Sequence, residues 1–140
     1  MVHALEQAWQ VLRPGGMLRY WRPGSFDSPM DVLADDVVEH AGTVDMTADL
    51  PDDQASDESI EAAVRAGVFV PKEVRKFEFS YYWASLEGMR EYTQERWETA
   101  VFPAEVVGGT RSLLEALGPE ARIRITLPMH LATYEKPRAA

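Results

Sequence analysis

The chain lacks cysteine, long apolar runs and an overall excess of basic residues. Without cysteine it has no disulfide, no thiolate metal ligand and no cysteine nucleophile, which fits a reducing compartment. No run of about eighteen apolar residues occurs, which is the length needed to cross a bilayer as a helix. Residues 1–16 lack the basic start, apolar run and small-residue cleavage site of a secretion signal. These absences predict a cytoplasmic protein with no membrane partner.

The shortage of basic residues is confined to one segment. The 140 residues carry 14 Lys and Arg against 23 Asp and Glu, for a formal net charge of −9. Twelve of the acids lie between Pro23 and Val64, where no Lys or Arg occurs, and the remaining eleven acids and 14 bases net +3. Nucleic-acid phosphates require a cationic face, so we expect no nucleic-acid partner. The negative charge belongs to an acidic, insert-like segment at about 24–64.

Length and composition are those of a single globular domain. A chain of 15.8 kDa has the size of one domain, which we place at residues 1–140. The apolar share of 46% and the charged share of 26% are typical of a protein with a packed core.

The first quarter of the chain has the pattern of a helix followed by a strand. Apolar residues recur at three- to four-residue spacing from Val2 to Leu12, which predicts a helix with one apolar stripe. An Arg-Pro-Gly-Gly segment at 13–16 ends this helix, because proline disfavours helix in the preceding residue. Met17–Trp21 then has the pattern of a short strand. This order is typical of the middle of an α/β unit.

The acidic segment contains a predicted hairpin, a loop and a helix. Apolar clusters on both sides of Asp35-Asp36 predict a small β-hairpin between 32 and 44. Residues 45–58 are rich in Asp, Pro and Ser without periodicity, which predicts a loop. Asp57 is a suitable N-cap for a following helix that ends at Gly67.

The second half alternates strands and helices. Aromatic and polar residues alternate over Phe77–Trp83, which predicts a strand with one apolar face. Ser85 has the position of an N-cap for the next helix. Another helix is predicted from Pro103 to Gly118, and alternation over 123–131 predicts a long final strand.

Two segments resemble a known enzyme family. Leu5–Leu18, with its Val-Leu-Arg-Pro-Gly-Gly core, is similar to the crossover helix and turn that precede the fifth strand of class I S-adenosylmethionine-dependent methyltransferases. Tyr81–Met89 resembles the end of the sixth strand and the substrate-side helix of that family. The resemblance implies an α/β fold, here the C-terminal portion of a Rossmann-like sheet and α+β in isolation. It implies three to five strands, an antiparallel edge hairpin and about four helices.

The cofactor-binding half of the family is missing from the sequence. Family members hold the cofactor with a glycine-rich turn after the first strand, where backbone N–H groups approach the ligand. No G-x-G-x-x-G occurs here, and the glycine pairs at 15–16 and 108–109 fall in a turn and in a predicted helix. We therefore assign no cofactor-binding residue and expect the isolated chain to bind no S-adenosylmethionine and to be inactive as an enzyme.

The sequence supports two interpretations of the function of this chain. In the first, it is the C-terminal, substrate-side part of a methyltransferase, acting on an unidentified small molecule. Its sheet is completed by a homodimer partner or by a missing N-terminal half, which predicts an open edge on Met17–Trp21. The alternative is a non-enzymatic α+β module for dimerisation or protein interaction.

Two residues are candidates on the substrate side, and none is assigned a catalytic role. Arg22 ends the strand at which open α/β sheets place their ligands, so it meets an anionic substrate group or pairs with a carboxylate of the acidic segment. Tyr82 is out of phase with the apolar face of its strand, so we expect it at the surface or in a pocket.

No metal site is expected from the sequence. His3, His40 and His130 are far apart, and the acids at 45–53 lack the order of a calcium loop. The acidic segment is expected to repel anions and to favour neutral or cationic substrates, or to keep the chain in solution.

Overall fold

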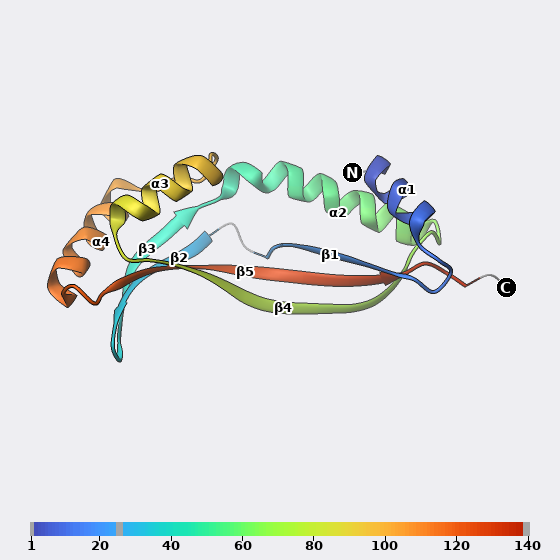
Figure 1. The fold of residues 1–140 in the computed structure, drawn as a ribbon. Helices are drawn as coiled ribbons and strands as arrows, with labels where there is room; N and C mark the ends of the chain where they lie inside the picture. The colour runs from blue at the N-terminus through green and yellow to red at the C-terminus, as the bar shows by residue number, and fades with distance from the viewer. Residues whose placement is uncertain (1, 25–26, 139–140) are drawn as a thin grey trace. The chain divides into compact units, whose positions relative to one another are not determined.

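The computed structural model describes residues 2–24 and 27–138 of the chain (Figure 1). Within these ranges it contains four α-helices, five strands and one short 3-10 helix. In chain order the elements are α1 (Val2–Val11), β1 (Met17–Pro23), β2 (Asp27–Ala34), β3 (Val37–Asp45), η1 (Thr47–Asp49), α2 (Leu50–Arg65), β4 (Val70–Trp83), α3 (Leu86–Arg96), α4 (Ala104–Leu117) and β5 (Arg122–Glu135). The α+β class and the approximate numbers of strands and helices agree with the sequence prediction.

The strands form one five-stranded sheet in the order β1-β5-β2-β3, with β4 also pairing with β5. The end of β5 pairs antiparallel with β1, from Met17 opposite Glu135 to Pro23 opposite Met129. The start of β5 pairs antiparallel with β2, from Met30 opposite Ile125 to Leu33 opposite Arg122. Pro128 lies between these two paired stretches, where its missing N–H is tolerated.

Contacts group the chain into two compact units, which we describe separately. Unit 1 contains residues 2–24, 50–77 and 129–138, and unit 2 contains residues 27–49 and 78–128. The acidic segment is divided between them, because its hairpin belongs to unit 2 and α2 belongs to unit 1.

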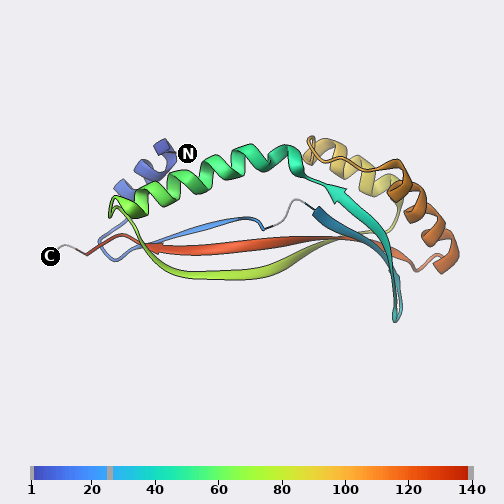
Figure 2. The ribbon, with the colours of Figure 1, turned by 180° about the vertical axis from the view of Figure 1, so that it is seen from behind.

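Unit 1 combines α1 and α2 with β1 and the adjoining parts of β4 and β5. Both helices lie on the same side of these strands (Figures 1 and 2). The prediction of a loop over 45–58 is wrong, because α2 begins at Leu50. Pro51 is compatible with the first turn, and Asp52 and Asp53 there interact favourably with the helix dipole. The predicted N-cap Asp57 is instead in the middle of the helix.

Unit 2 holds the larger apolar core. Side chains from α3 and α4 pack against the inner face of β2, β3 and β5. The buried members of this core are Met30, Val44, Leu86, Met89, Val106, Ile123 and Ile125. The predicted N-cap of α3 is confirmed, since Ser85 Oγ accepts a 3.1 Å hydrogen bond from the Gly88 N–H. The helix α4 runs without interruption across Gly108-Gly109.

The aromatic strand is longer than its sequence pattern, because β4 starts at Val70 and not at Phe77. At its end, Tyr81 and Trp83 pack against Tyr92 of α3 and against Trp97, the C-cap residue of that helix, with ring centroids 5.1–6.0 Å apart. Tyr82 is 56% exposed, as its opposite phase predicts. No helix in the described ranges is long and apolar enough to cross a membrane.

Candidate functional site

A cavity of about 210 Å³ lies in unit 1 between α2 and the strands. Its polar lining comes from three elements. The strand β1 contributes Tyr20 and Arg22, α2 contributes Asp57 and Glu61, and β5 contributes His130 and Tyr134. Because these side chains bring charged and hydrogen-bonding groups together around one cavity, we treat it as the candidate site.

Strand and helix periodicity explain why these side chains meet. In the β1–β5 register, Arg22 is opposite His130 and Tyr20 is opposite Ala132, so alternate residues of both strands face α2. Asp57 and Glu61 are four residues apart and therefore share one side of α2. Ile60 is only 5% exposed and anchors that side of the helix. The site is thus built by two pairings between distant segments of the chain.

The guanidinium of Arg22 is held by a carboxylate of the acidic segment. Its Nε donates to Asp57 Oδ1 at 2.8 Å, and its Nη2 lies 2.6 Å from Asp57 Oδ2. Its Nη1 donates to the Pro23 carbonyl at 2.7 Å. The sequence allowed Arg22 either an anionic substrate group or a carboxylate of the acidic segment as its partner. In the structure its partner is the carboxylate of Asp57. The bidentate geometry orients Arg22 and neutralises most of its charge.

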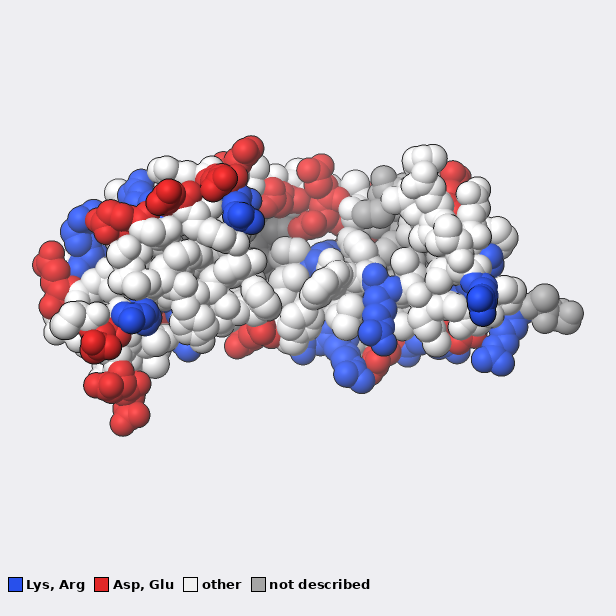
Figure 3. Space-filling view, viewed as in Figure 1, with Lys and Arg blue, Asp and Glu red and all other residues white. Residues whose placement is uncertain are grey.

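Two tyrosines give the cavity its aromatic walls. Burial raises the pKa of Tyr20, a side-chain hydrogen bond with Ser56 lowers it by less, and the negative charge of Asp57 adds a smaller increase. Burial also raises the pKa of Tyr134, with the negative charges of Asp57 and Glu61 acting in the same direction. Both phenols therefore remain protonated at neutral pH. The charged lining consists of one cation and two carboxylates, which leaves an excess negative charge. Figure 3 shows other acidic side chains gathered over the first part of α2.

The raised pKa values predict an alkaline loss of stability. Both phenols titrate above the ordinary tyrosine value of 10.0 in the folded chain. The unfolded chain takes up negative charge first, so the contribution of these two phenols to the free energy of unfolding is complete below pH 10.0 and is lost as the pH rises through the raised values. Urea unfolding at pH 8 to 11 measures this slope. The variant Tyr20→Phe/Tyr134→Phe is expected to have a shallower slope, and an unchanged slope would contradict the assignment.

His130 reaches the cavity because residue 24 has no side chain. A Cβ built on Gly24 would lie 2.6 Å from His130 Cδ2. The sequence pattern points to His130 only as a possible metal ligand, which it excludes, and does not point to Tyr20 or Tyr134 as site residues. The alternation of Tyr20 with Arg22 along one strand is the signal that could have found Tyr20. His130 and Tyr134 required knowledge of which strand pairs with β1.

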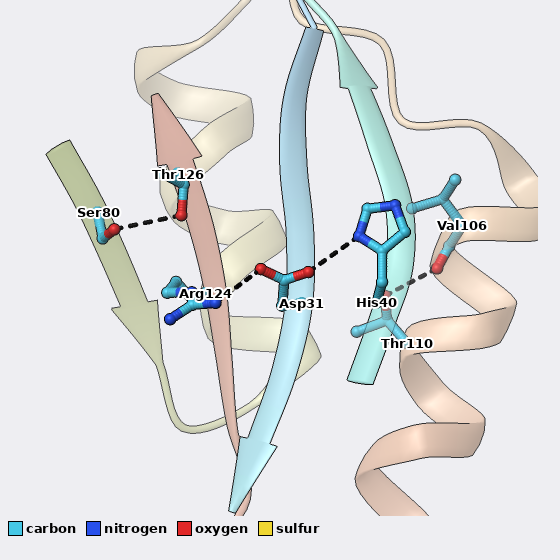
Figure 4. Close-up of polar contacts among 7 residues, drawn as sticks. All are labelled: Asp31, His40, Ser80, Val106, Thr110, Arg124 and Thr126. Carbon is cyan, nitrogen blue, oxygen red and sulfur yellow. Dashed lines mark hydrogen bonds and ion pairs between the residues drawn. The ribbon is translucent and has the colours of Figure 1, made fainter. Parts of the chain in front are cut away.

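The second sequence candidate, Tyr82, belongs to unit 2 and lines a polar cluster rather than this cavity. The cluster centres on Asp31, whose carboxylate accepts a 2.9 Å hydrogen bond from Arg124 Nη2 and lies 2.9 Å from His40 Nδ1 (Figure 4). The pKa of Arg124 is raised chiefly by its hydrogen bond to Asp31 and further by Tyr82. Asp31 is 7% exposed, so these partners compensate a buried charge. We interpret the cluster as structural.

The histidines have separate surroundings. His3 contacts the Gln7 side chain, His40 contacts Asp31, and His130 lines the cavity. In the part of the chain that the structure describes, no group of three or more histidine or acidic side chains is placed to hold a metal ion.

Comparison with known proteins identified no relative of this chain. No protein-family model, curated protein or solved structure matches the chain.

Proposed function

We propose that this chain is the C-terminal, substrate-side part of a class I S-adenosylmethionine-dependent methyltransferase, with the cofactor-binding half supplied by another segment. The observation that carries the proposal is the pairing of three strands. The resemblance identifies β1 as the fifth strand and the last two strands as an antiparallel edge hairpin. In the structure β4 pairs with β5, and β5 pairs antiparallel with β1, so the three strands are neighbours.

An open edge supports the same proposal. Among the described strands, β1 pairs only with β5, so its second edge has no strand beside it. Such an edge favours pairing with another segment. A preceding strand of the same sheet would satisfy its backbone groups.

An open face is the second supporting feature. Doubly wound sheets carry helices on both faces. In unit 1, α1 and α2 lie on one side of the strands, where Tyr20 and Arg22 point. Met17 and Trp21 alternate with them and are 49% and 66% exposed. A helical layer contributed by the N-terminal half would bury these two side chains.

The cavity beside Arg22 is the acceptor site in this proposal. It lies at the carboxyl end of β1, where open α/β sheets bind their ligands. Methyl transfer depends mainly on holding the acceptor in line with the donor methyl group. We therefore assign the lining residues a positioning role and name no catalytic residue.

The exposure of Met17 and Trp21 also favours a second candidate function, a non-enzymatic module that associates through β1. An apolar pair beside an unpaired strand edge is suited to contact another copy or another protein. The two candidates differ in whether S-adenosylmethionine is bound once an N-terminal half is present.

Calorimetry and light scattering test the proposal. The 140-residue chain is expected to bind no S-adenosylmethionine in the micromolar range, because it has no glycine-rich turn. It is expected to self-associate in light scattering, since the β1 edge is open. Trp21→Lys is expected to lower the associated fraction, whereas Val101→Lys, at a 55% exposed site in unit 2, leaves it unchanged.

Two results would contradict the proposal. Micromolar binding of S-adenosylmethionine by the chain alone would place a cofactor site where we assign none. A stable monomer at high concentration would remove the argument from the open edge. Reading the DNA upstream of the Met1 codon for an in-frame or frameshifted glycine-rich half then separates the methyltransferase from the interaction module.

A further inference from the structure

We propose that the cavity between α2 and β1 binds a small organic cation of the primary or secondary ammonium class. The inference rests on the proposed function in taking this cavity as the acceptor site, and it names the class of substrate. It is carried by the charge, the aromatic walls and the size of the cavity.

The charged groups of the cavity favour a cation over an anion. Three N–H groups of Arg22 are engaged by Asp57 and by the Pro23 carbonyl. An incoming anion would therefore have to displace a bidentate carboxylate. Among the described residues, the salt-bridge partner of Glu61 is Arg65, at 3.8 Å and with both side chains about 70% exposed, which makes it a weak pair. The carboxylate of Glu61 is thus available to an ammonium group, and it lies beside an Arg22–Asp57 ion pair whose two charges offset each other.

The aromatic and apolar walls suit an organic cation better than a metal ion. Tyr20 and Tyr134 line the cavity, and the electron-rich faces of phenol rings attract ammonium groups. Ile60 and Ala132 add an apolar surface for the hydrocarbon part of a ligand. The two carboxylates are the only acidic side chains in the lining, and no cluster of three ligands is available in the described ranges.

The size of the cavity limits the ligand. Liquid water occupies about 30 Å³ per molecule, and the cavity of about 210 Å³ holds the volume of about seven waters. A ligand of about seven to ten non-hydrogen atoms fills this space. Benzylamine, which is protonated at neutral pH, is a suitable probe, and benzoate is an anion of nearly the same shape.

The experiment titrates the 140-residue chain with benzylamine and benzoate at pH 7 and follows backbone amide shifts by NMR. Saturable shifts are expected with benzylamine at the end of β1 and along α2, and none with benzoate. Glu61→Gln is expected to weaken benzylamine binding by up to about fivefold, the range of an exposed ion pair. Glu58→Gln makes the same change on an exposed site of α2 outside the cavity lining and is expected to have no effect.

Neutralising both carboxylates of the lining is the sharper test. In Asp57→Asn/Glu61→Gln, the charge of Arg22 has no opposing carboxylate in the lining. This variant is expected to lose benzylamine binding and to gain benzoate binding. Circular dichroism of each variant verifies that α2 is retained. If the double variant fails to fold, the single variant Asp57→Asn replaces it in the two ligand titrations.

Three results would overturn the inference. They are no benzylamine binding by the folded wild-type chain, equal binding of benzoate, and equal effects of Glu58→Gln and Glu61→Gln. None of these measurements uses S-adenosylmethionine or the β1 edge. Failure of the cation site therefore differs from failure of the methyltransferase proposal, which is tested by cofactor binding and association.

Discussion

Replacing Gly42 with alanine is expected to lower the free energy of unfolding by about 3 kcal/mol, with contributions from backbone strain and from overpacking. Gly42 has a φ of +147°, a conformation that residues with a Cβ rarely adopt. The register of the β2–β3 hairpin shifts between Met30 and Asp31, where Gly42 and His40 are their respective partners. A Cβ at position 42 would also lie 2.5 Å from Val106 Cγ2 of α4. Urea unfolding measures the loss.

Gly67→Ala is the matched control for this prediction. Gly67 also has a positive φ, of +73°, but a Cβ there would meet no atom within 4 Å. The control is expected to cost about 1 kcal/mol, which is the backbone cost of a side chain in the left-handed conformation without a steric contact. A double-mutant cycle between Gly42→Ala and Val106→Ala should show a favourable coupling, because the smaller side chain relieves the contact. Equal losses of unfolding free energy in Gly42→Ala and Gly67→Ala would contradict the predicted contact with Val106.

Replacing Asp31 with alanine is expected to cost about 2–3 kcal/mol, because it leaves the Arg124 guanidinium partly buried without its carboxylate. The side chain of Asp31 is 10% exposed and that of Arg124 is 28% exposed. The partial exposure of Arg124 places the loss below the range for fully buried pairs. Asp36→Ala, at an exposed acid in the hairpin turn, is expected to change stability by less than about 0.5 kcal/mol.

The double variant Asp31→Leu/Arg124→Met tests the physical cause. Replacing both charges with apolar side chains removes the unpaired group, so most of the lost stability is expected to return. Chemical denaturation of Asp31→Leu, Arg124→Met and the double variant gives the coupling energy between the two side chains. A double variant as unstable as the sum of the single ones would mean that the ion pair is not the source of the effect.

Local periodicity predicted most elements of this fold. The helix before the Arg-Pro-Gly-Gly turn, the hairpin around Asp35-Asp36 and the Ser85 N-cap each depend on residues close together in the sequence. Their patterns are local, because capping, turns and apolar stripes involve neighbours within one or two helical turns. The prediction failed at the start of α2. The acids at 52–53 suggest a solvated loop in composition, yet they stabilise the first turn of a helix.

The candidate site could be predicted only in part. The sequence placed Arg22 at the end of a strand and allowed it a carboxylate partner, and the structure supplies Asp57. Tyr82 was correctly expected to be exposed, but it belongs to a different unit from Arg22. His130 and Tyr134 are more than 100 residues away from Arg22 or Tyr20 in the sequence. Their presence in the cavity depends on the β1–β5 register, which no local pattern encodes.

Three features of this protein follow from its residues alone: the absence of thiol chemistry, the order of most helices and strands, and the confinement of the negative charge to the segment at about 24–64. The role of that charge depends on the fold. Asp31 is the buried centre of a polar cluster, and Asp57 is the partner of Arg22 in a cavity with two tyrosines. The reason is physical: composition records how many charges a segment carries, whereas burial and pairing depend on which distant segments fold against it.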